Sequence, residues 1–232
     1  MSDDYERYGD YDDIEEDAPK GKRSPIALIL KILIGVVCVG VVGLLAFRMI
    51  IFNNYPDVVT DIYFDDELAE YYNLHNGSIG AKTQDLRAPY DDPDLGNFFC
   101  DHLIVIEGVD QLQITVRYNT GNLSRMEEAL GFSLDADDAD IFEYRLVDNY
   151  GRVYEKQVGR IFASQLMYRY TKLAFDDVDL SPSTGDAPEW IRLEIFVRDL
   201  DATEPYAMVP IYENNAVYSD FTPYELSSGE KP

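Results

Sequence analysis

An apolar run over residues 26–52 constrains this chain most, since charge interrupts it only at Lys31 near its start and Arg48 near its end. A helix rises about 1.5 Å per residue, so the uncharged stretch 32–47 covers roughly 25 Å, close to a hydrocarbon core of about 30 Å. A charge at the bilayer centre is costly, but a long side chain near a helix end carries its charge to the headgroups. The run predicts a transmembrane helix over residues 24–52.

Basic residues indicate the direction of this helix. Lys20, Lys22 and Arg23 precede the run, whereas the next basic residue after Arg48 is Lys82. Because Lys and Arg are retained in the cytoplasm, we expect a single-pass type II protein of the cell membrane, with a cytoplasmic N-terminus and an extracytoplasmic C-terminal domain. A cleaved signal peptide is the alternative, but the run is long for one and lacks the small-x-small cleavage pattern.

The residues before the helix are strongly acidic. Residues 1–18 are dense in Asp and Glu with three tyrosines between them, so residues 1–23 predict a disordered cytoplasmic tail that ends in a basic cluster. This tail is interpreted as a solvated leader or as a docking or tyrosine-phosphorylation peptide. The whole chain carries 44 acidic and 19 basic residues, a net charge of −25, which argues against nucleic acid as a partner.

Residues 53–99 predict a juxtamembrane segment and loop packed on the main domain. Within them, 58–64 favours a strand, 65–73 a short helix with its apolar residues on one side, and 75–97 a long loop rich in Gly, Pro, Asn and Asp.

Alternating patterns typical of strands begin at residue 100. Residues 111–118 place Leu112, Ile114 and Val116 on one face and polar side chains on the other, which predicts a half-buried strand. Further strands are expected at 103–106, 142–146, 152–157, 165–175, 190–198 and 206–213. Pro210 lacks an N–H donor, so it predicts that the last of these is an edge strand or contains a bulge. A short helix is expected at 124–130, with Ser124 and Glu127 as a capping box.

These patterns together predict an antiparallel β-sandwich over residues 100–218, immunoglobulin-like, with one or two short helices and a disordered tail at 219–232. The spacing of Phe142, Tyr144, Leu146, Asp148 and Gly151 resembles hairpins common in bacterial immunoglobulin-like ectodomains.

Cysteine usage favours a bacterial cell envelope. Cys38 lies inside the apolar run and Cys100 is the single cysteine beyond it, so no intramolecular disulfide can close the domain. Cys100 is interpreted as a buried apolar residue next to Phe98 and Phe99, with an intermolecular disulfide as the alternative.

Catalytic patterns lack essential parts, and we expect no enzyme. The chain has two histidines, His75 and His102, in no zinc-ligand spacing, and it carries no nucleophile elbow and no phosphate-binding loop. No cofactor is expected except Ca²⁺, for which one acidic loop is a candidate although its spacing is not that of an EF-hand. The candidate ligands are Asp135, Asp137, Asp138 and Asp140.

The expected function is therefore binding or scaffolding in the cell envelope. The expected partners are the lipid bilayer and other envelope or membrane proteins, with a glycan as a further alternative. Two other functions remain open: a signalling or assembly subunit that couples an extracytoplasmic sensor to the acidic tail, and an envelope hydrolase that uses paired carboxylates.

Overall fold

A computed structural model describes residues 25–84, 86, 88–92, 96–131, 133, 141–155, 157–165, 167–178, 180, 187–198, 203–213, 221–226, 230 and 232. The chain divides into two compact units, Met1–Phe52 and Asn53–Pro232. In the first unit, helix α1 (Pro25–Asn53) contains a 23-residue stretch, Leu28–Ile50, with a mean hydropathy of 2.8, none of which is buried. This stretch is long and apolar enough to cross a membrane, as the sequence predicts.

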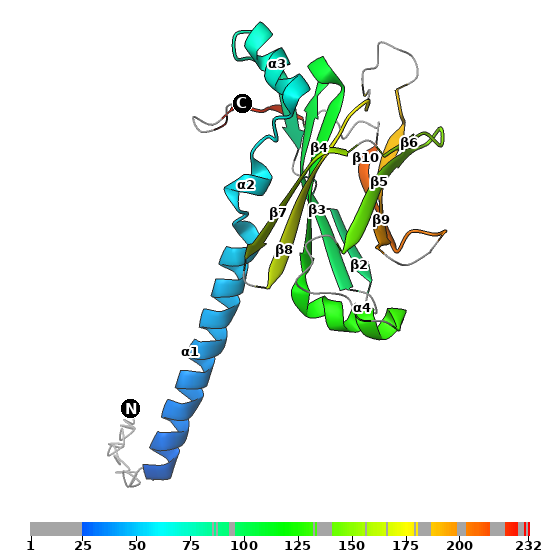
Figure 1. Cartoon of the computed structure of the whole chain (residues 1–232). Coiled ribbons are helices and arrows are strands. Elements are labelled where there is room, and N and C mark those ends of the chain that lie inside the picture. Colours follow the sequence, from blue (N-terminus) through cyan, green and yellow to red (C-terminus); the bar gives the residue numbers. More distant parts are fainter. Residues whose placement is uncertain are drawn as a thin grey trace, which may run out of the picture. The chain divides into compact units, whose positions relative to one another are not determined.

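The second unit is mainly β (Figure 1). A seven-stranded antiparallel sheet has the order β11-β1-β3-β4-β8-β7, with β2 also paired to β3, and a four-stranded antiparallel sheet has the order β10-β9-β5-β6. The larger sheet consists of β1 (Ala81–Gln84), β2 (Ala88–Asp92), β3 (Gly96–Ile106), β4 (Gln111–Asn119), β7 (Gln157–Gln165), β8 (Tyr168–Phe175) and β11 (Thr222–Pro223). The smaller sheet consists of β5 (Phe142–Asp148), β6 (Val153–Tyr154), β9 (Trp190–Val197) and β10 (Ala207–Glu213).

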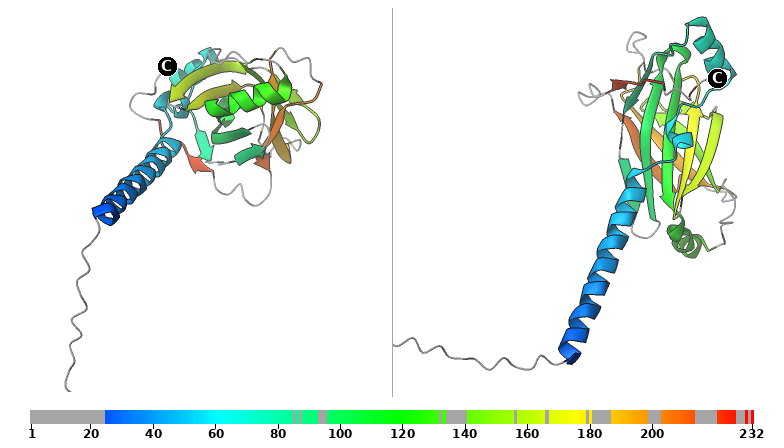
Figure 2. Two further views of the ribbon diagram at one scale, coloured as in Figure 1. Left: turned by 90° about the horizontal axis from the view of Figure 1, so that it is seen from below. Right: turned by 90° about the vertical axis from the view of Figure 1, so that its left-hand side faces the viewer.

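The main hydrophobic core is shared by the two sheets, which lie side by side in Figures 1 and 2. Strand alternation supplies it, because successive side chains point to opposite faces. Leu112, Ile114 and Val116 from β4 pack in one cluster with Leu193 and Ile195 from β9, and all five are fully buried. The two antiparallel sheets and few helices confirm the prediction of a mainly β domain.

Strand β4 differs from the prediction, because it is buried on both faces. Its polar residues Gln111, Gln113, Thr115 and Arg117 are each 1% exposed or less. The segment that follows α1 accounts for this burial. It includes α2 (Asp57–Thr60) and α3 (Asp66–Leu74), and it lies on the face of the larger sheet that points away from the shared core.

A second hydrophobic cluster fixes the far end of this segment. Ile62 and Leu68 pack with Ile79, Ala81 and residues of β3, and Tyr71 and Tyr224 are partly buried against the same cluster. Helix α3 begins with Asp65 as its N-cap, whose Oδ1 accepts from the Leu68 N–H at 2.8 Å, so the helix predicted at 65–73 is confirmed.

Other local predictions are confirmed in the same way. Helix α4 (Leu123–Leu130) ends at Gly131, which has a φ of +77°, and β5 turns into β6 through Gly151 at a φ of +76°. Strand β10 lies at a sheet edge, and its register shifts between Pro210 and Tyr212, as the proline predicts.

Four local predictions are wrong. Residues 58–64 form no strand, since α2 occupies Asp57–Thr60. The expected loop 75–97 contains β1 and β2, and the expected tail 219–232 contributes β11, which pairs with β1. Ser124 lies inside α4, so it is not the N-cap of a capping box. Two short η turns, Glu107–Val109 and Thr120–Asn122, complete the elements.

Candidate functional site

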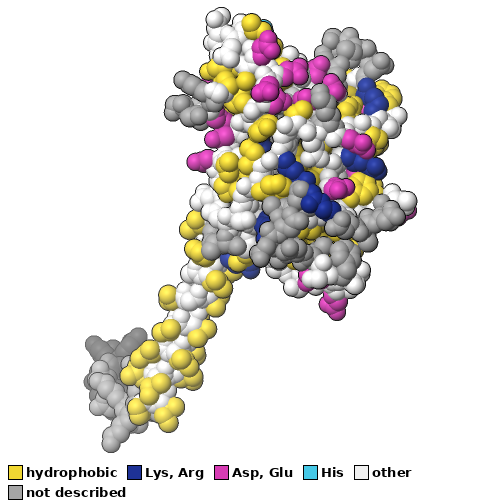
Figure 3. All heavy atoms as spheres, viewed as in Figure 1, with side chains coloured by type: hydrophobic (Ala, Val, Ile, Leu, Met, Phe, Trp, Pro, Cys, Tyr) yellow, Lys and Arg dark blue, Asp and Glu magenta, His cyan; other side chains and the backbone are white. Residues whose placement is uncertain are grey.

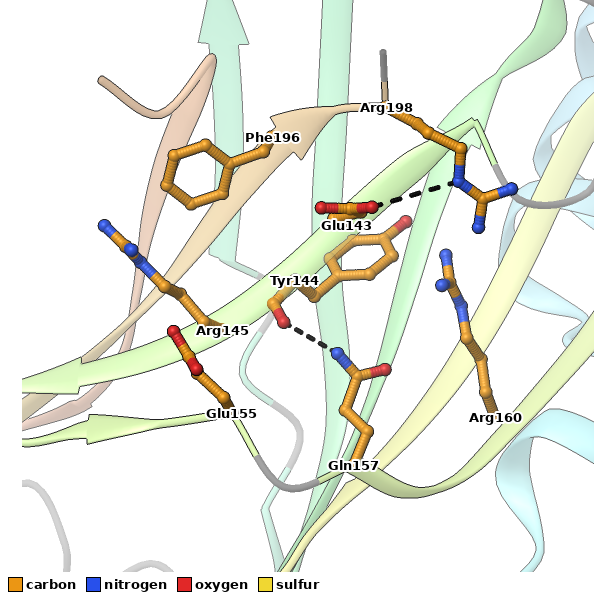
Figure 4. Close-up of a pocket in the computed structure, with 8 residues that line it drawn as sticks. All are labelled: Glu143, Tyr144, Arg145, Glu155, Gln157, Arg160, Phe196 and Arg198. Carbon is orange, nitrogen blue, oxygen red and sulfur yellow. Dashed lines mark hydrogen bonds and ion pairs between the residues drawn. The ribbon is translucent and has the colours of Figure 1, made fainter. Parts of the chain in front are cut away.

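A cleft of about 470 Å³ opens where β5 of the smaller sheet approaches β7 of the larger one (Figure 4). Strand β5 supplies its outward residues Glu143 and Arg145, β9 supplies Phe196, and β7 supplies Arg160. The full lining is Glu143, Tyr144, Arg145, Glu155, Gln157, Arg160, Phe196 and Arg198. Three arginines thus face one cleft in a chain with a net charge of −25.

Aromatic rings hold two of these arginines. The Arg145 guanidinium carbon lies 4.5 Å from the ring centre of Phe196, and that of Arg160 lies 5.0 Å from Tyr144 and 4.9 Å from Phe162. Arg145 also forms an ion pair through its Nε with Glu194. Cation–π contacts of this kind fix the plane of a guanidinium group, which makes it a pre-oriented donor.

The third arginine has a looser carboxylate contact. Arg198 lies directly after β9, and its Nε is 4.0 Å from Glu143 Oε1. Figure 4 shows the guanidinium groups of Arg198 and Arg160 pointing toward one another, with the Tyr144 hydroxyl to one side of them. Burial raises the pKa of Tyr144 above its usual range, so this hydroxyl stays protonated in alkaline solution as well as at neutral pH.

Side chains from β7 also satisfy the backbone of β5. Gln157 Nε2 donates to the Tyr144 carbonyl at 2.6 Å, and Arg160 donates to the Phe142 carbonyl. Strand β6 does not pair with this part of β5, since it reaches only Leu146 and Val147. The lining is therefore rich in positioned hydrogen-bond donors.

Charge is unevenly distributed around this cleft. In Figure 3, which has the view of Figure 1, Lys and Arg side chains gather over the region of β5 and β7, whereas Asp and Glu side chains gather around α3. The cleft is thus a local basic area on an acidic protein, and such areas attract anionic groups.

A second polar cluster lies on the opposite side of the larger sheet. There, side chains of β4 and β8 bind the backbone of residues 59–63. Thr115 Oγ1 donates to the Val59 carbonyl at 2.5 Å, and Lys172 Nζ donates to the carbonyls of Thr60 and Asp61. Glu230 Oε1 accepts from the Ile62 N–H at 2.7 Å. Main-chain groups of residues 59–62 therefore bind to side chains of β4, β8 and Glu230.

Burial of this cluster changes its acid–base behaviour. Burial lowers the pKa of Lys172 to about 8, although Asp61 and Glu230 oppose this shift. Burial raises the pKa of Tyr55, whose hydroxyl donates to Asp101, and the hydrogen bond acts in the same direction. Arg117 stacks on the rings of Tyr55, Phe99 and Tyr168 at 4.9, 4.8 and 5.2 Å.

The acidic loop singled out from the sequence is not described by the structure. Asp135, Asp137, Asp138 and Asp140 fall outside the described residues, so the Ca²⁺ hypothesis remains a prediction. Within the described part of the chain, no group of three or more His, Cys, Asp or Glu side chains could hold a metal ion.

The single cysteine of the second unit is confirmed as a core residue. Cys100 is 0% exposed, and burial raises its pKa. His102 packs edge-on against Tyr55 at a ring-centre distance of 4.6 Å, in the irregular stretch of β3.

Sequence reasoning missed the cleft, because its residues come from β5, β7 and β9, which are far apart in the chain. The one available signal is the alternation of Glu143 and Arg145 with apolar residues, which marks them as outward-facing.

No family model, curated protein or solved structure matches this chain.

Proposed function

We propose that this chain is a single-pass type II membrane protein that displays an acidic, immunoglobulin-like domain outside the cytoplasm. The domain acts there as a binding or scaffolding module of the cell envelope. The length and hydropathy of Leu28–Ile50 support the anchor, and the basic residues before it support the orientation.

Strand order supports the immunoglobulin-like assignment. The neighbours β3-β4-β8-β7 in one sheet and β10-β9-β5-β6 in the other correspond, in chain order, to strands A-B-E-D and G-F-C-C′ of immunoglobulin-like sandwiches. Strands β1, β2 and β11 are additions at the edge next to β3.

The proposed binding role is supported chiefly by residues 55–63, which follow α1 and are docked on the larger sheet; we call them the membrane-proximal segment. Main-chain hydrogen bonds to Gln113, Thr115 and Lys172 hold this segment on one face of the larger sheet. That face is therefore occupied by the chain itself. The smaller sheet presents Met208 and Val153 at 39 and 47% exposure, and the turn between β5 and β6 presents Tyr150 at 56%. A module built this way offers one sheet to partners while the other is attached to the anchor segment.

Site-specific photo-crosslinking in intact cells tests this role. A photoreactive amino acid replaces Met208 on the exposed sheet, and a matched variant carries it at exposed Arg125 of α4. We expect discrete crosslinked envelope proteins from position 208 and none from position 125. Equal crosslinking from both positions, or none from either, contradicts a binding role for this sheet.

A sensor or assembly subunit is the second candidate, and the short connection favours it. Only Asn53 and Asn54 separate Phe52 from Tyr55, the first side chain of the docked segment. Movement of such a domain is transmitted to its helix, whereas a flexible linker absorbs it. Inserting ten Gly and Ser residues after Asn54 distinguishes the two roles. A scaffold keeps its crosslinks and its cellular phenotype, whereas a sensor keeps its crosslinks and loses the phenotype.

A further inference from the structure

We propose that the outer face of the smaller sheet binds an apolar patch of a partner protein, and that a carboxylate of this patch pairs with Arg192. The outer face consists of the side chains of β5, β6, β9 and β10 that point away from the shared core. The proposal rests on the binding role proposed above and names the chemistry of the partner. Three properties of the structure carry it: the apolar composition of this face, the surroundings of Arg192, and the charge of the rest of the chain.

Apolar side chains make up much of the outer face. In β9, Ile191, Leu193 and Ile195 belong to the core, so the residues that alternate with them point outward. The apolar residues of the outer face, each at least partly exposed, are Val147, Val153, Trp190, Phe196, Met208 and Pro210. Aromatic residues and methionine are enriched at protein–protein contacts, and a contiguous exposed apolar face is typical of a binding surface.

Arg192 lies among these residues without a carboxylate beside it. Its cross-strand neighbours are Pro210 of β10 and Val147 of β5, and neither carries a charge. Its guanidinium carbon lies 4.3 Å from the centre of the Trp190 ring, and its Nη1 donates to the Met208 sulfur at 3.7 Å. Within the described part of the chain, Arg192 forms no ion pair. The ring fixes the guanidinium plane while the group stays exposed, which makes it a pre-oriented donor.

Arg145 shows how the same face satisfies another arginine. Glu194 lies directly opposite it on β9, and Arg145 Nε is 2.5 Å from Glu194 Oε2. The Arg145 guanidinium also stacks on Phe196 at 4.5 Å, as that of Arg192 stacks on Trp190. The two arginines therefore have matching aromatic contacts, but only Arg145 has a carboxylate across the strand. A carboxylate from a partner completes the same arrangement at Arg192.

The composition and charge of the face favour a protein as this partner. A small anion would pair with Arg192 but leave the apolar residues in water, whereas a protein patch covers both. Arg192 lies over the Trp190 ring, where a sugar would stack. A second copy brings a further net charge of −25, which opposes self-association. The same charge repels carboxylates over most of the surface, so a carboxylate-bearing partner is directed to Arg192.

Peptide binding to the full-length protein in a non-ionic amphipol tests the proposal. The probe is a capped peptide of sequence Gly-Leu-Glu-Phe-Glu-Leu-Gly, and the control peptide has Gln in place of each Glu. Trp190 is the single tryptophan of the chain, so its emission reports binding at this face. We expect saturable binding of the glutamate peptide and about tenfold weaker binding of the glutamine peptide.

Variants of the protein separate the two parts of the proposed contact. Arg192→Gln should weaken the glutamate peptide about tenfold and leave the glutamine peptide unchanged. Arg192→Lys should weaken the glutamate peptide less, because it keeps the charge but loses the planar donor pair. Val153→Ser removes apolar area at an exposed position and should weaken both peptides by a similar factor. Arg125→Gln removes a charge from an exposed position on α4 and should leave both affinities unchanged. Unchanged melting temperatures show that each variant is folded.

Four results overturn the proposal. They are the absence of saturable binding of the glutamate peptide, equal losses in the Arg192→Gln and Arg125→Gln variants, tighter Arg192-dependent binding of polygalacturonate, and Arg192-dependent dimerisation. The third makes an acidic glycan the occupant, and the fourth makes a second copy the occupant. Crosslinks from position 208 without peptide binding overturn only this proposal, whereas peptide binding without crosslinks overturns only the proposed function.

Discussion

The side chain of Gln113 forms two hydrogen bonds with the main chain of Tyr63. Gln113 Nε2 donates to the Tyr63 carbonyl at 2.7 Å, and the Tyr63 N–H donates to Gln113 Oε1 at 2.9 Å. A neighbouring strand would satisfy the same two groups in the same way. Gln113 thus substitutes for strand pairing, and it holds the segment that follows α1 on β4, although Tyr63 belongs to no strand.

The Gln113→Leu variant should lose this attachment. It leaves the Tyr63 N–H and carbonyl without partners near a buried position, so we expect a loss of about 2–4 kcal/mol in the free energy of unfolding. Hydrogen exchange at residues 59–65 should increase by a larger factor than in β9. Thr60→Ala removes an exposed hydrogen bond of the same segment and should cost less than about 0.5 kcal/mol. Equal effects of the two variants on unfolding would contradict the role of Gln113.

The Tyr63 ring also requires a glycine beneath it. A Cβ built on Gly159 lies 2.0 Å from Tyr63 Cε1, so the Gly159→Ala variant must displace the ring. We expect Gly159→Ala to destabilise the protein by about 1–3 kcal/mol. The cost should disappear in a Tyr63→Ala background, because the clash is then absent. Chemical denaturation of the four members of this double-mutant cycle measures the coupling. Additive effects would show that Tyr63 does not pack on Gly159.

Lys172 should make stability depend on pH above neutrality. The folded protein releases the Lys172 proton near pH 8, whereas the unfolded chain keeps it up to the ordinary pKa of 10.5. Between these values the unfolded state binds more protons, so stability rises with pH. The gain in stability is complete above pH 10.5, where Lys172 is neutral in both states. It is lost as the pH falls to about 8, where the folded protein must bury a charged Lys172. Lys172→Met should lack this rise in urea denaturation between pH 8 and 9.5. A variant with the same slope as the wild type would exclude Lys172 as its source.

Cys100 should resist thiol reagents in the folded protein. Its side chain is fully buried, and burial raises its pKa, so very little reactive thiolate forms. In a Cys38→Ser background, iodoacetamide should label Cys100 only after denaturation. Rapid labelling of the native protein, or a dimer sensitive to reductant, would support the alternative of an intermolecular disulfide.

The sequence predicts those parts of the fold that depend on local patterns. Period-2 alternation identifies β4 and β9, Gly131 marks the end of α4, and Pro210 marks the irregular edge strand. Each of these signals acts over a few residues. The turn at Gly151 is predicted for the same reason, since its positive φ favours glycine.

The parts that it does not predict depend on contacts between distant residues. The polar face of β4 has the pattern of a solvent-exposed surface, but residues 59–63 cover it, and nothing in the sequence of β4 indicates that cover. Strands β1 and β11 are too short to show a period, and they form because β1 pairs with β3 and β11 pairs with β1 at the sheet edge. The cleft has the same origin, since Arg160 and Arg198 approach only after both sheets form.

Protease protection in intact cells or spheroplasts, with a tag at each end of the chain, tests the central claim most directly. A type II membrane protein with an extracytoplasmic domain predicts that external protease removes the C-terminal tag and leaves the N-terminal tag intact. A protected C-terminal tag would place the acidic domain in the cytoplasm and contradict the orientation. Release of the chain into the medium would contradict the anchor itself.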